Sequence, residues 1–212
     1  MDKKIVILGR KWSKRQFFIS ALWGIGLLAL SLFINYIAGT YASNHISNPV
    51  NDIILDNLPA KDVYGVFIYG LVAFFIFLAV LCAFLPRSIP FVLKSLSIFI
   101  VVRSFFIILT HTAPSIHQIP MDVEYRIANF FTFTGDLFFS AHTGLPFLMA
   151  QVFWKKAWLR NIFITASIFF GFIVLLGHLH YSIDVFSAFF ITYGIFRISK
   201  WIFEKDYELL NS

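Results

Sequence analysis

The sequence contains little charge, one cysteine and no Asn-x-Ser/Thr glycosylation site. Only 13% of its 212 residues are Asp, Glu, Lys or Arg, whereas soluble chains contain about 25% charged residues. Hydrophobic residues make up 59% and include 28 Phe, and the mean hydropathy is +0.80. This composition excludes a water-soluble globule and predicts a membrane protein. Because Cys82 stands alone, an intrachain disulfide framework is also excluded.

Six apolar stretches are long enough to cross a membrane. A hydrocarbon core of about 30 Å needs about 20 apolar residues, since a helix rises about 1.5 Å per residue. We therefore predict an all-α bundle of six transmembrane helices, residues 16–203, between a basic N-terminus (1–15) and a tail (204–212). The loop at 39–63 is either a plain connector or holds a short interfacial helix. The predicted spans are residues 16–38, 64–85, 90–112, 138–154, 161–181 and 182–203.

The positive charges predict the orientation of this bundle. Fourteen of the 17 Lys and Arg residues fall at the N-terminus or in segments on its side of the membrane, so both termini are expected in the cytoplasm. All six His residues fall on the opposite, extracytoplasmic face. The cations flank apolar runs, which indicates topology and anionic lipid rather than nucleic acid. The basic N-terminus is either a topogenic signal alone or a segment that also lies on the anionic inner surface.

One candidate nucleophile is His180, which precedes Asp184 by four residues. On a helix this spacing lets the carboxylate reach one imidazole nitrogen. That contact would select the tautomer and stabilise the positive charge that grows when the other nitrogen attacks an electrophile. The alternative is a contact that only seats the last helix.

The second candidate histidine is His142, which we expect on the same face as His180. Their separation of 38 positions covers one passage in and one passage back through the bilayer. Ser140 and Thr143 flank His142 at a predicted helix N-terminus, where hydroxyl and backbone N–H groups can receive a phosphate. The alternative is an ordinary helix cap followed by a buried histidine.

A further cation, Arg103, lies inside the third predicted span and is expected to face the same region. A charge at this depth costs about 2.5–3.5 kcal/mol on insertion scales and normally has a functional or paired reason. Its structural alternative is an ion pair with Asp184 or Asp136, and Asp136 itself either caps the fourth helix or orients a site residue. Together these groups supply what phosphoryl transfer needs, namely a nucleophile, an acid and donors for the phosphate oxygens.

Two segments carry a family resemblance. Residues 135–143 (GDLFFSAHT) and 180–185 (HYSIDV), continued by 188–192 (AFFIT), resemble motifs of the sphingomyelin synthase branch of the type 2 phosphatidic acid phosphatase superfamily. The likeness covers roughly residues 95–196. Thr134 and Ala141 stand where that branch has Cys and Gly.

The resemblance implies a six-span, metal-independent enzyme without a cofactor. His180 would attack the phosphorus of a phospholipid and form a phosphohistidine, Asp184 would orient it, and His142 would act as acid and then as base. The acceptor would be a lipid alcohol, ceramide or diacylglycerol, with hydrolysis by water as the alternative, as in a lipid phosphate phosphatase or a phospholipase C-like enzyme. The residues expected to contact the phosphate are Arg103, Ser140, Thr143, Asp136, Tyr181 and His178.

Two readings compete with this one. A zinc-dependent amidase would use His142, His178 and His180 as ligands, but residues 178 and 180 would point to nearly opposite faces of a helix. A non-catalytic lipid-binding scaffold or transporter would fit the composition, but the sequence shows no inverted repeat and no pair of broken helices.

Overall fold

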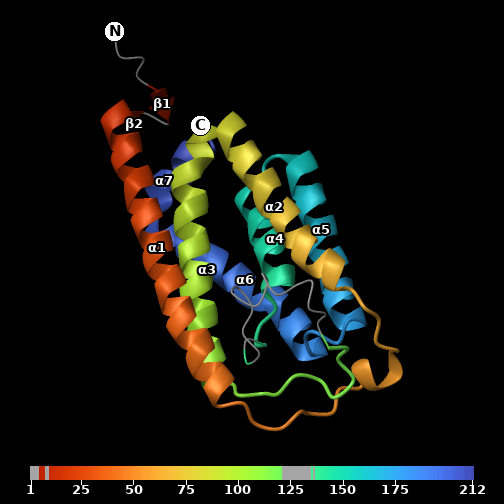
Figure 1. Cartoon of the computed structure of the whole chain (residues 1–212). Coiled ribbons are helices and arrows are strands. Elements are labelled where there is room, and N and C mark those ends of the chain that lie inside the picture. Colours follow the sequence, from red (N-terminus) through yellow and green to blue (C-terminus); the bar gives the residue numbers. More distant parts are fainter. Residues whose placement is uncertain (1–4, 8–9, 121–134, 136) are drawn as a thin grey trace.

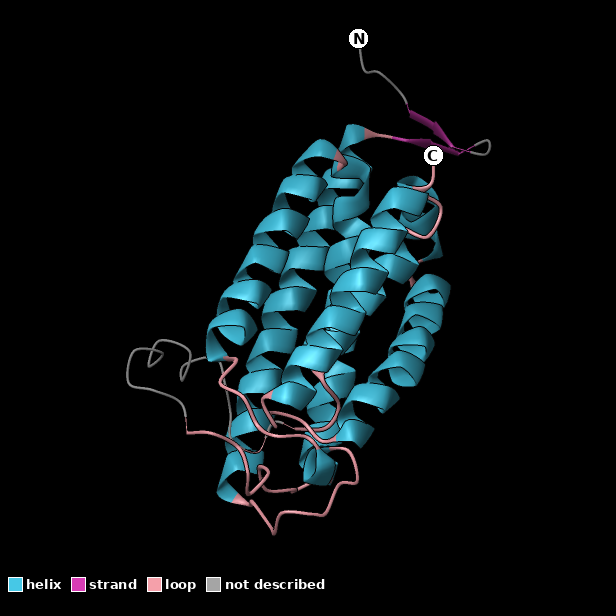
Figure 2. Ribbon diagram, turned by 90° about the vertical axis from the view of Figure 1, so that its right-hand side faces the viewer, coloured by secondary structure: helices cyan, strands magenta, loops and turns pink. Residues whose placement is uncertain are grey.

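The computed structural model describes residues 5–7, 10–120, 135 and 137–212 of the chain. Figure 1 shows a bundle of roughly aligned helices with both termini at one end and most connecting loops at the other. Figure 2 shows the same arrangement from the side. The long helices are α1 (Lys14–Asn44), α2 (Tyr64–Phe84), α3 (Ile89–Leu109), α5 (Ala157–Leu176) and α6 (Ser182–Ile202).

The shorter elements complete the two ends of the bundle. Ahead of α1, two three-residue strands pair antiparallel, with Ile5 opposite Trp12. Two short 3₁₀ turns lie before α2 and α3. The short elements are β1 (Ile5–Ile7), β2 (Arg10–Trp12), η1 (Leu55–Asn57), η2 (Pro86–Ser88), α4 (Ala141–Val152) and α7 (Glu204–Leu210).

Five helices of the described part are long and apolar enough to cross a membrane. They are α1, α2, α3 with the preceding turn, α5 and α6, and they correspond to five of the six predicted spans. Their outer surfaces carry large apolar side chains such as Phe84, Phe190 and Trp201, each at least 80% exposed. Exposure of this much apolar surface to water would be strongly unfavourable, so the chain is an integral membrane protein.

The remaining predicted span, residues 138–154, corresponds to the much shorter α4. Its 12 residues extend about 18 Å, which is too short to cross a core of about 30 Å. Most of α4 is buried, and it packs against α5 and α6. Figure 1 shows α4 beginning partway along the bundle. The six-span count and the cytoplasmic location of the termini remain predictions.

The main core lies between α3, α4, α5 and α6 and is rich in phenylalanine. Phe99, Phe139, Phe153 and Phe163 are all almost completely buried. The rings of Phe99 and Phe139 meet edge to face with centroids 5.4 Å apart, an arrangement that aromatic pairs favour. This core fixes the start of α4 against α3 and α6.

The predicted tail, residues 204–212, is part of the bundle. It forms α7, in which Leu209 is fully buried and Asp206 is 4% exposed. Asp206 pairs with Lys94 of α3 at 2.7 Å, and Ser20 of α1 donates a hydrogen bond to the same carboxylate at 2.5 Å. Burying an unpaired ammonium group is energetically costly. The Asp206 carboxylate offsets this cost for Lys94 and so links α7 to α3.

Candidate active site

The connection between α5 and α6 is a tight turn that presents His180. At the end of α5 the His178 N–H bonds to the Leu175 carbonyl, and the Leu179 N–H bonds to the Val174 carbonyl. This is the Schellman pattern, which needs one residue in the left-handed conformation. His178 takes that place, with φ of 53°, although glycine or asparagine is the usual choice. The chain therefore reverses within Gly177–Tyr181, and α6 begins at Ser182.

His180 and Asp184 are close, but they do not share one helix as the sequence predicts. His180 lies before the first turn of α6, and Asp184 occupies the third position of that helix. The distance from His180 Nδ1 to Asp184 Oδ2 is 3.5 Å, while Nδ1 is buried and forms no hydrogen bond. The pair is thus an electrostatic contact formed by the capping turn, because the helix starts too late to give it a helical spacing.

The carboxylate of Asp184 also caps its own helix. Asp184 Oδ2 accepts a hydrogen bond from the Tyr181 N–H at 2.9 Å, as in a capping box. The backbone carbonyl of Asp184 accepts one from the Ser140 N–H at 3.0 Å. These two bonds join the motif at 180–185 to the start of α4, so the predicted convergence of the two motifs is present in the fold.

His142 lies in the first turn of α4 and is 7% exposed. Its Nε2–H donates to the carbonyl of Phe67 in α2 at 3.1 Å, and its ring stacks on the Phe67 ring at 3.9 Å. Because a carbonyl only accepts, Nε2 carries the proton and Nδ1 has the free lone pair in the neutral ring.

Arg103 enters the same region from α3 and is 6% exposed. Its Nε donates to the backbone carbonyl of Phe139 at 2.8 Å. Phe139 precedes Ser140, the residue that caps α4. The guanidinium is therefore held beside the N-terminus of α4, where the helix dipole and the Arg charge both favour an anion.

Ser140 and Thr143 form the N-terminal cap of α4. Ser140 Oγ accepts the Thr143 N–H at 3.5 Å and the Thr143 hydroxyl at 3.4 Å, and both side chains are completely buried. Ser167 of α5 donates to the Thr143 carbonyl at 2.7 Å. Both residues thus stabilise the turn that positions His142. Their contact with a phosphate stays a prediction.

Tyr181 and His178 bond to the loops at this end of the bundle. Tyr181 Oη donates to the Ala113 carbonyl at 2.9 Å and accepts from the Val50 N–H at 3.3 Å. His178 Nε2 donates to the Leu58 carbonyl at 2.9 Å. Their polar atoms therefore attach two loops to the His180 turn, and substrate contact by either residue remains a prediction.

Asp52, in the loop after α1, is a site residue that sequence reasoning missed. Its Oδ2 accepts from the N–H of Ser182, the first residue of α6, at 2.6 Å, and its Oδ1 accepts from Ile54 and Leu55. Burial raises the pKa of Asp52, but the hydrogen bonds from Ser182, Leu55 and Ile54 outweigh it and lower the pKa below its ordinary value of 3.8. The 39–63 loop thus holds the His180 turn, a long-range contact that no local motif reveals.

Asp136, which the sequence predicts as a site residue, lies outside the described residues. Within the described part of the chain, no three His, Cys, Asp or Glu side chains are grouped to hold a metal ion, so the zinc-site reading of His142, His178 and His180 has no ligand cluster there.

The fold and the site together define an integral membrane protein whose two histidine motifs are joined by a backbone hydrogen bond beside a helix N-terminus and a buried arginine. Residues 134–201, which include α4, α5, α6 and both motifs, match the family model described as PAP2 superfamily C-terminal. No curated protein and no solved structure gives a match. The family match supports the PAP2 superfamily and suggests a lipid enzyme of the phosphoesterase type. The sphingomyelin synthase-like branch rests on the motif resemblance alone.

Proposed function

We propose that the chain is a metal-independent lipid phosphotransferase that moves a phospho-head group from a phospholipid to a lipid alcohol through a phosphohistidine. The observation that carries this proposal is the junction of the two motifs. The Ser140 N–H bonds to the Asp184 carbonyl at 3.0 Å, which brings the His142 turn beside the His180 turn and the Arg103 guanidinium. A nucleophile, an acid–base group and an anion site are then within reach of one phosphate.

In the first step, His180 Nε2 attacks the phosphorus while the bond from phosphorus to the leaving alkoxide oxygen breaks. Asp184, 3.5 Å from Nδ1, stabilises the positive charge that develops on the ring. The equatorial phosphate oxygens lie against Arg103 and the N-terminus of α4, whose donors compensate the charge of the transition state.

His142 supplies the proton for the leaving alkoxide. The Nε2–H of His142 is anchored on the Phe67 carbonyl, so the proton is exchanged at Nδ1. Protonated His142 gives the Nδ1 proton to the departing oxygen. In the second step Nδ1 takes a proton from the acceptor hydroxyl, whose oxygen attacks phosphorus, and the P–N bond to His180 breaks. With water as acceptor the same steps give hydrolysis.

The test is the reaction of purified protein in lipid vesicles, followed by mass spectrometry. Vesicles contain phosphatidylcholine or phosphatidylethanolamine as donor, with ceramide or diacylglycerol as acceptor. We expect a new phospho-head-group lipid and little free phosphocholine or phosphoethanolamine. Release of phosphocholine or phosphoethanolamine to water without transfer would replace the transferase with a hydrolase.

The covalent step has its own test. With a donor labelled on phosphorus and no added acceptor, wild-type protein quenched in alkali early in the reaction is expected to carry protein-bound label that is labile in acid and stable in alkali, as a phosphoramidate is. His180→Ala removes this label. His45→Ala is the matched control, because His45 is an exposed imidazole at the same end of the bundle, and it should keep wild-type activity. Full activity of His180→Ala would overturn the proposal and favour a non-catalytic lipid-binding protein.

A further inference from the structure

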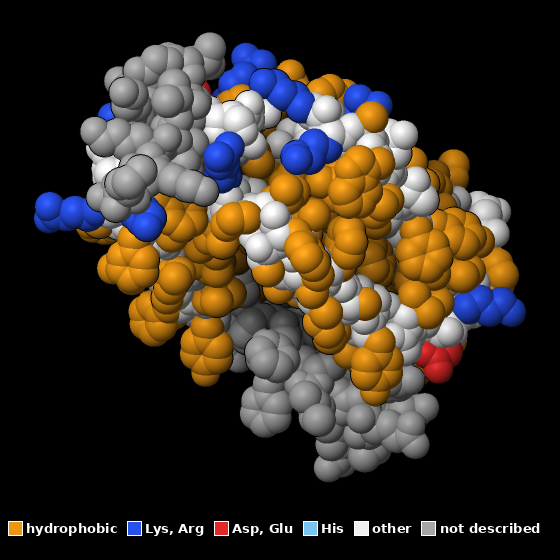
Figure 3. Space-filling view, turned by 90° about the horizontal axis from the view of Figure 1, so that it is seen from above, with side chains coloured by type: hydrophobic (Ala, Val, Ile, Leu, Met, Phe, Trp, Pro, Cys, Tyr) orange, Lys and Arg blue, Asp and Glu red, His pale blue; other side chains and the backbone are white. Residues whose placement is uncertain are grey.

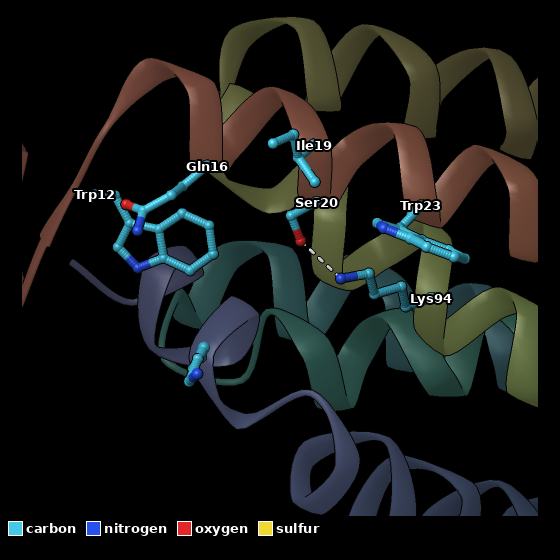
Figure 4. A pocket seen from close by; sticks show the side chains of 7 residues that line it. Trp12, Gln16, Ile19, Ser20, Trp23 and Lys94 are labelled. Atoms are coloured by element: carbon cyan, nitrogen blue, oxygen red, sulfur yellow. Dashed lines mark hydrogen bonds between the residues drawn. The ribbon is translucent and has the colours of Figure 1, made fainter.

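The end of the bundle that carries both termini contains a cavity that the proposed chemistry does not use. Its volume is about 400 Å³. Figure 4 shows the side chains that line it, which come from β2, α1, α3 and α7. Lys94 comes from α3 and Lys205 from α7, and the other side chains that matter here are Trp12, Gln16, Ser20 and Trp23.

The inner wall of the cavity is a buried polar network centred on Lys94, which is 7% exposed. Lys94 Nζ donates to Ser20 Oγ at 2.6 Å and to Asp206 Oδ2 at 2.7 Å. An ammonium group has three N–H donors, and these two bonds use two of them. Lys94 Nζ also lies 5.1 Å from the centroid of the Phe203 ring, and because Lys94 lines the cavity, we take its third N–H as the donor for a guest there.

The outer wall adds a second cation. Lys205 is exposed and lies next to Asp206 in the chain, and among the described residues no carboxylate lines the cavity. Asp206 itself accepts bonds from Lys94 and Ser20. The indole N–H groups of Trp12 and Trp23 are further donors with no acceptor function. The cavity thus favours a guest with several acceptor oxygens and negative charge.

The surroundings of the cavity indicate a lipid guest. Lys and Arg side chains spread over this end of the molecule, and apolar side chains cover its flanks (Figure 3). Trp23 is 66% exposed on the outer surface of α1, and Ile19 beside it is 43% exposed. A guest held by Lys94 and Lys205 would place its acyl chains along this face of α1.

We propose that this cavity binds the phosphate head group of an anionic phospholipid from the adjacent leaflet. The phosphate oxygens accept from Lys205, from the third N–H of Lys94 and from the Trp12 indole. The acyl chains lie on Ile19 and Trp23. This proposal is independent of the proposed catalysis, because none of these residues belongs to the site of His142 and His180.

The test is native mass spectrometry of the full chain in neutral detergent, titrated with phosphatidylglycerol or with phosphatidylcholine of equal chain length. The comparison is between Lys205→Gln and Lys155→Gln, since Lys155 is also an exposed lysine of the terminal end but lies outside the cavity. We expect Lys205→Gln to raise the Kd for phosphatidylglycerol about fivefold, as about 1 kcal/mol per basic residue implies. Lys155→Gln should bind like the wild type.

Binding to the catalytic site is common to all three proteins and cancels in this comparison. Lys205→Glu should weaken phosphatidylglycerol further and leave phosphatidylcholine unchanged. Equal loss in Lys155→Gln would mean diffuse attraction by the charged end, and no loss in Lys205→Gln would remove the site. Glycerol phosphate or inorganic phosphate that competes as tightly as the lipid would make the guest a free phosphate, which would also overturn the proposal.

Discussion

Asp184 shows how one carboxylate can serve a helix and a nucleophile together. It accepts the Tyr181 N–H at 2.9 Å and lies 3.5 Å from His180 Nδ1. The hydrogen bond fixes the orientation of the Asp184 carboxylate. The negative charge of the carboxylate is therefore held close to the His180 imidazole. The capping role is a property of the fold, while the charge is what the proposed reaction requires.

We expect Asp184→Asn to separate these two roles. The amide oxygen can still accept the Tyr181 N–H, so the midpoint of thermal unfolding should change little. The neutral amide cannot stabilise the imidazolium, so kcat should fall about 10²- to 10⁴-fold. Head-group transfer and thermal unfolding of the same preparation measure both. A large fall in the unfolding midpoint together with unchanged kcat would contradict this division.

Asp52 makes a second residue-scale prediction, which concerns pH. Its folded pKa lies below 3.8, so its carboxylate stabilises the folded state fully above that pH and loses this effect as pH falls through the folded pKa. Asp52→Asn should destabilise the protein by about 1–2 kcal/mol at neutral pH. The difference in unfolding midpoint from the wild type should shrink below about pH 4. A difference that stays constant from pH 7 to pH 3 would show that the charge is not involved.

At the scale of elements, the crossing of α4 with α3 and α6 is set by Gly144. A Cβ atom at this position would lie 2.8 Å from the Phe99 ring and 2.9 Å from Thr192 Oγ1. Both neighbours are buried. The absence of a side chain therefore allows α4, and with it His142, to approach these helices closely.

Gly144→Ala should therefore destabilise the protein by about 1–3 kcal/mol through overpacking and lower head-group transfer by displacing the His142 turn. Gly194→Ala in α6 is the matched control, because a Cβ there meets nothing within 4 Å. The same change in open space should be neutral or slightly stabilising in a helix. The unfolding midpoints of both variants test this prediction. Equal changes in the two midpoints would mean that helix propensity, and not the close contact at Gly144, determines the effect.

The sequence predicts elements well where hydrophobicity alone forms them. The long apolar runs coincide with α1, α2, α3, α5 and α6 to within a few residues at most ends, although α1 extends to Asn44. The sequence predicts α4 less well, because a helix buried inside a bundle and a helix that crosses the lipid are both composed of apolar residues. The prediction that His180 and Asp184 share one helix was wrong, because His178, and not glycine, adopts the left-handed conformation of the turn and no local signal marks the start of α6 at Ser182.

Contacts between distant segments were the part that could not be predicted. Asp52 and Ser182 are 130 residues apart, and Ser20 and Asp206 are 186 apart. Neither pair has a local signature, since a lone Asp in a loop normally faces solvent. The convergence of the two histidine motifs could be anticipated only because the length between them matches two passages through a bilayer.

For the whole molecule, the charge distribution predicts that both termini are cytoplasmic, which labelling can measure. In a Cys82→Ser background, Ile53→Cys lies at the loop end, where Ile53 is 81% exposed, and Lys155→Cys lies in the exposed turn between α4 and α5. A maleimide that does not cross membranes should label residue 53 in intact cells and residue 155 only after permeabilisation. The reverse pattern would place the histidines in the cytoplasm.

The position of Asp206 in α7 also has a consequence for biosynthesis. Lys94 lies in α3, but its carboxylate partner follows α6 in the chain and is therefore synthesised later. Until α7 is made, the Lys94 ammonium lacks this carboxylate, so the polar contact between α1, α3 and α7 is completed only after α6. Chains interrupted before this point would carry an uncompensated cation, which gives a quality-control system a physical mark of incompleteness.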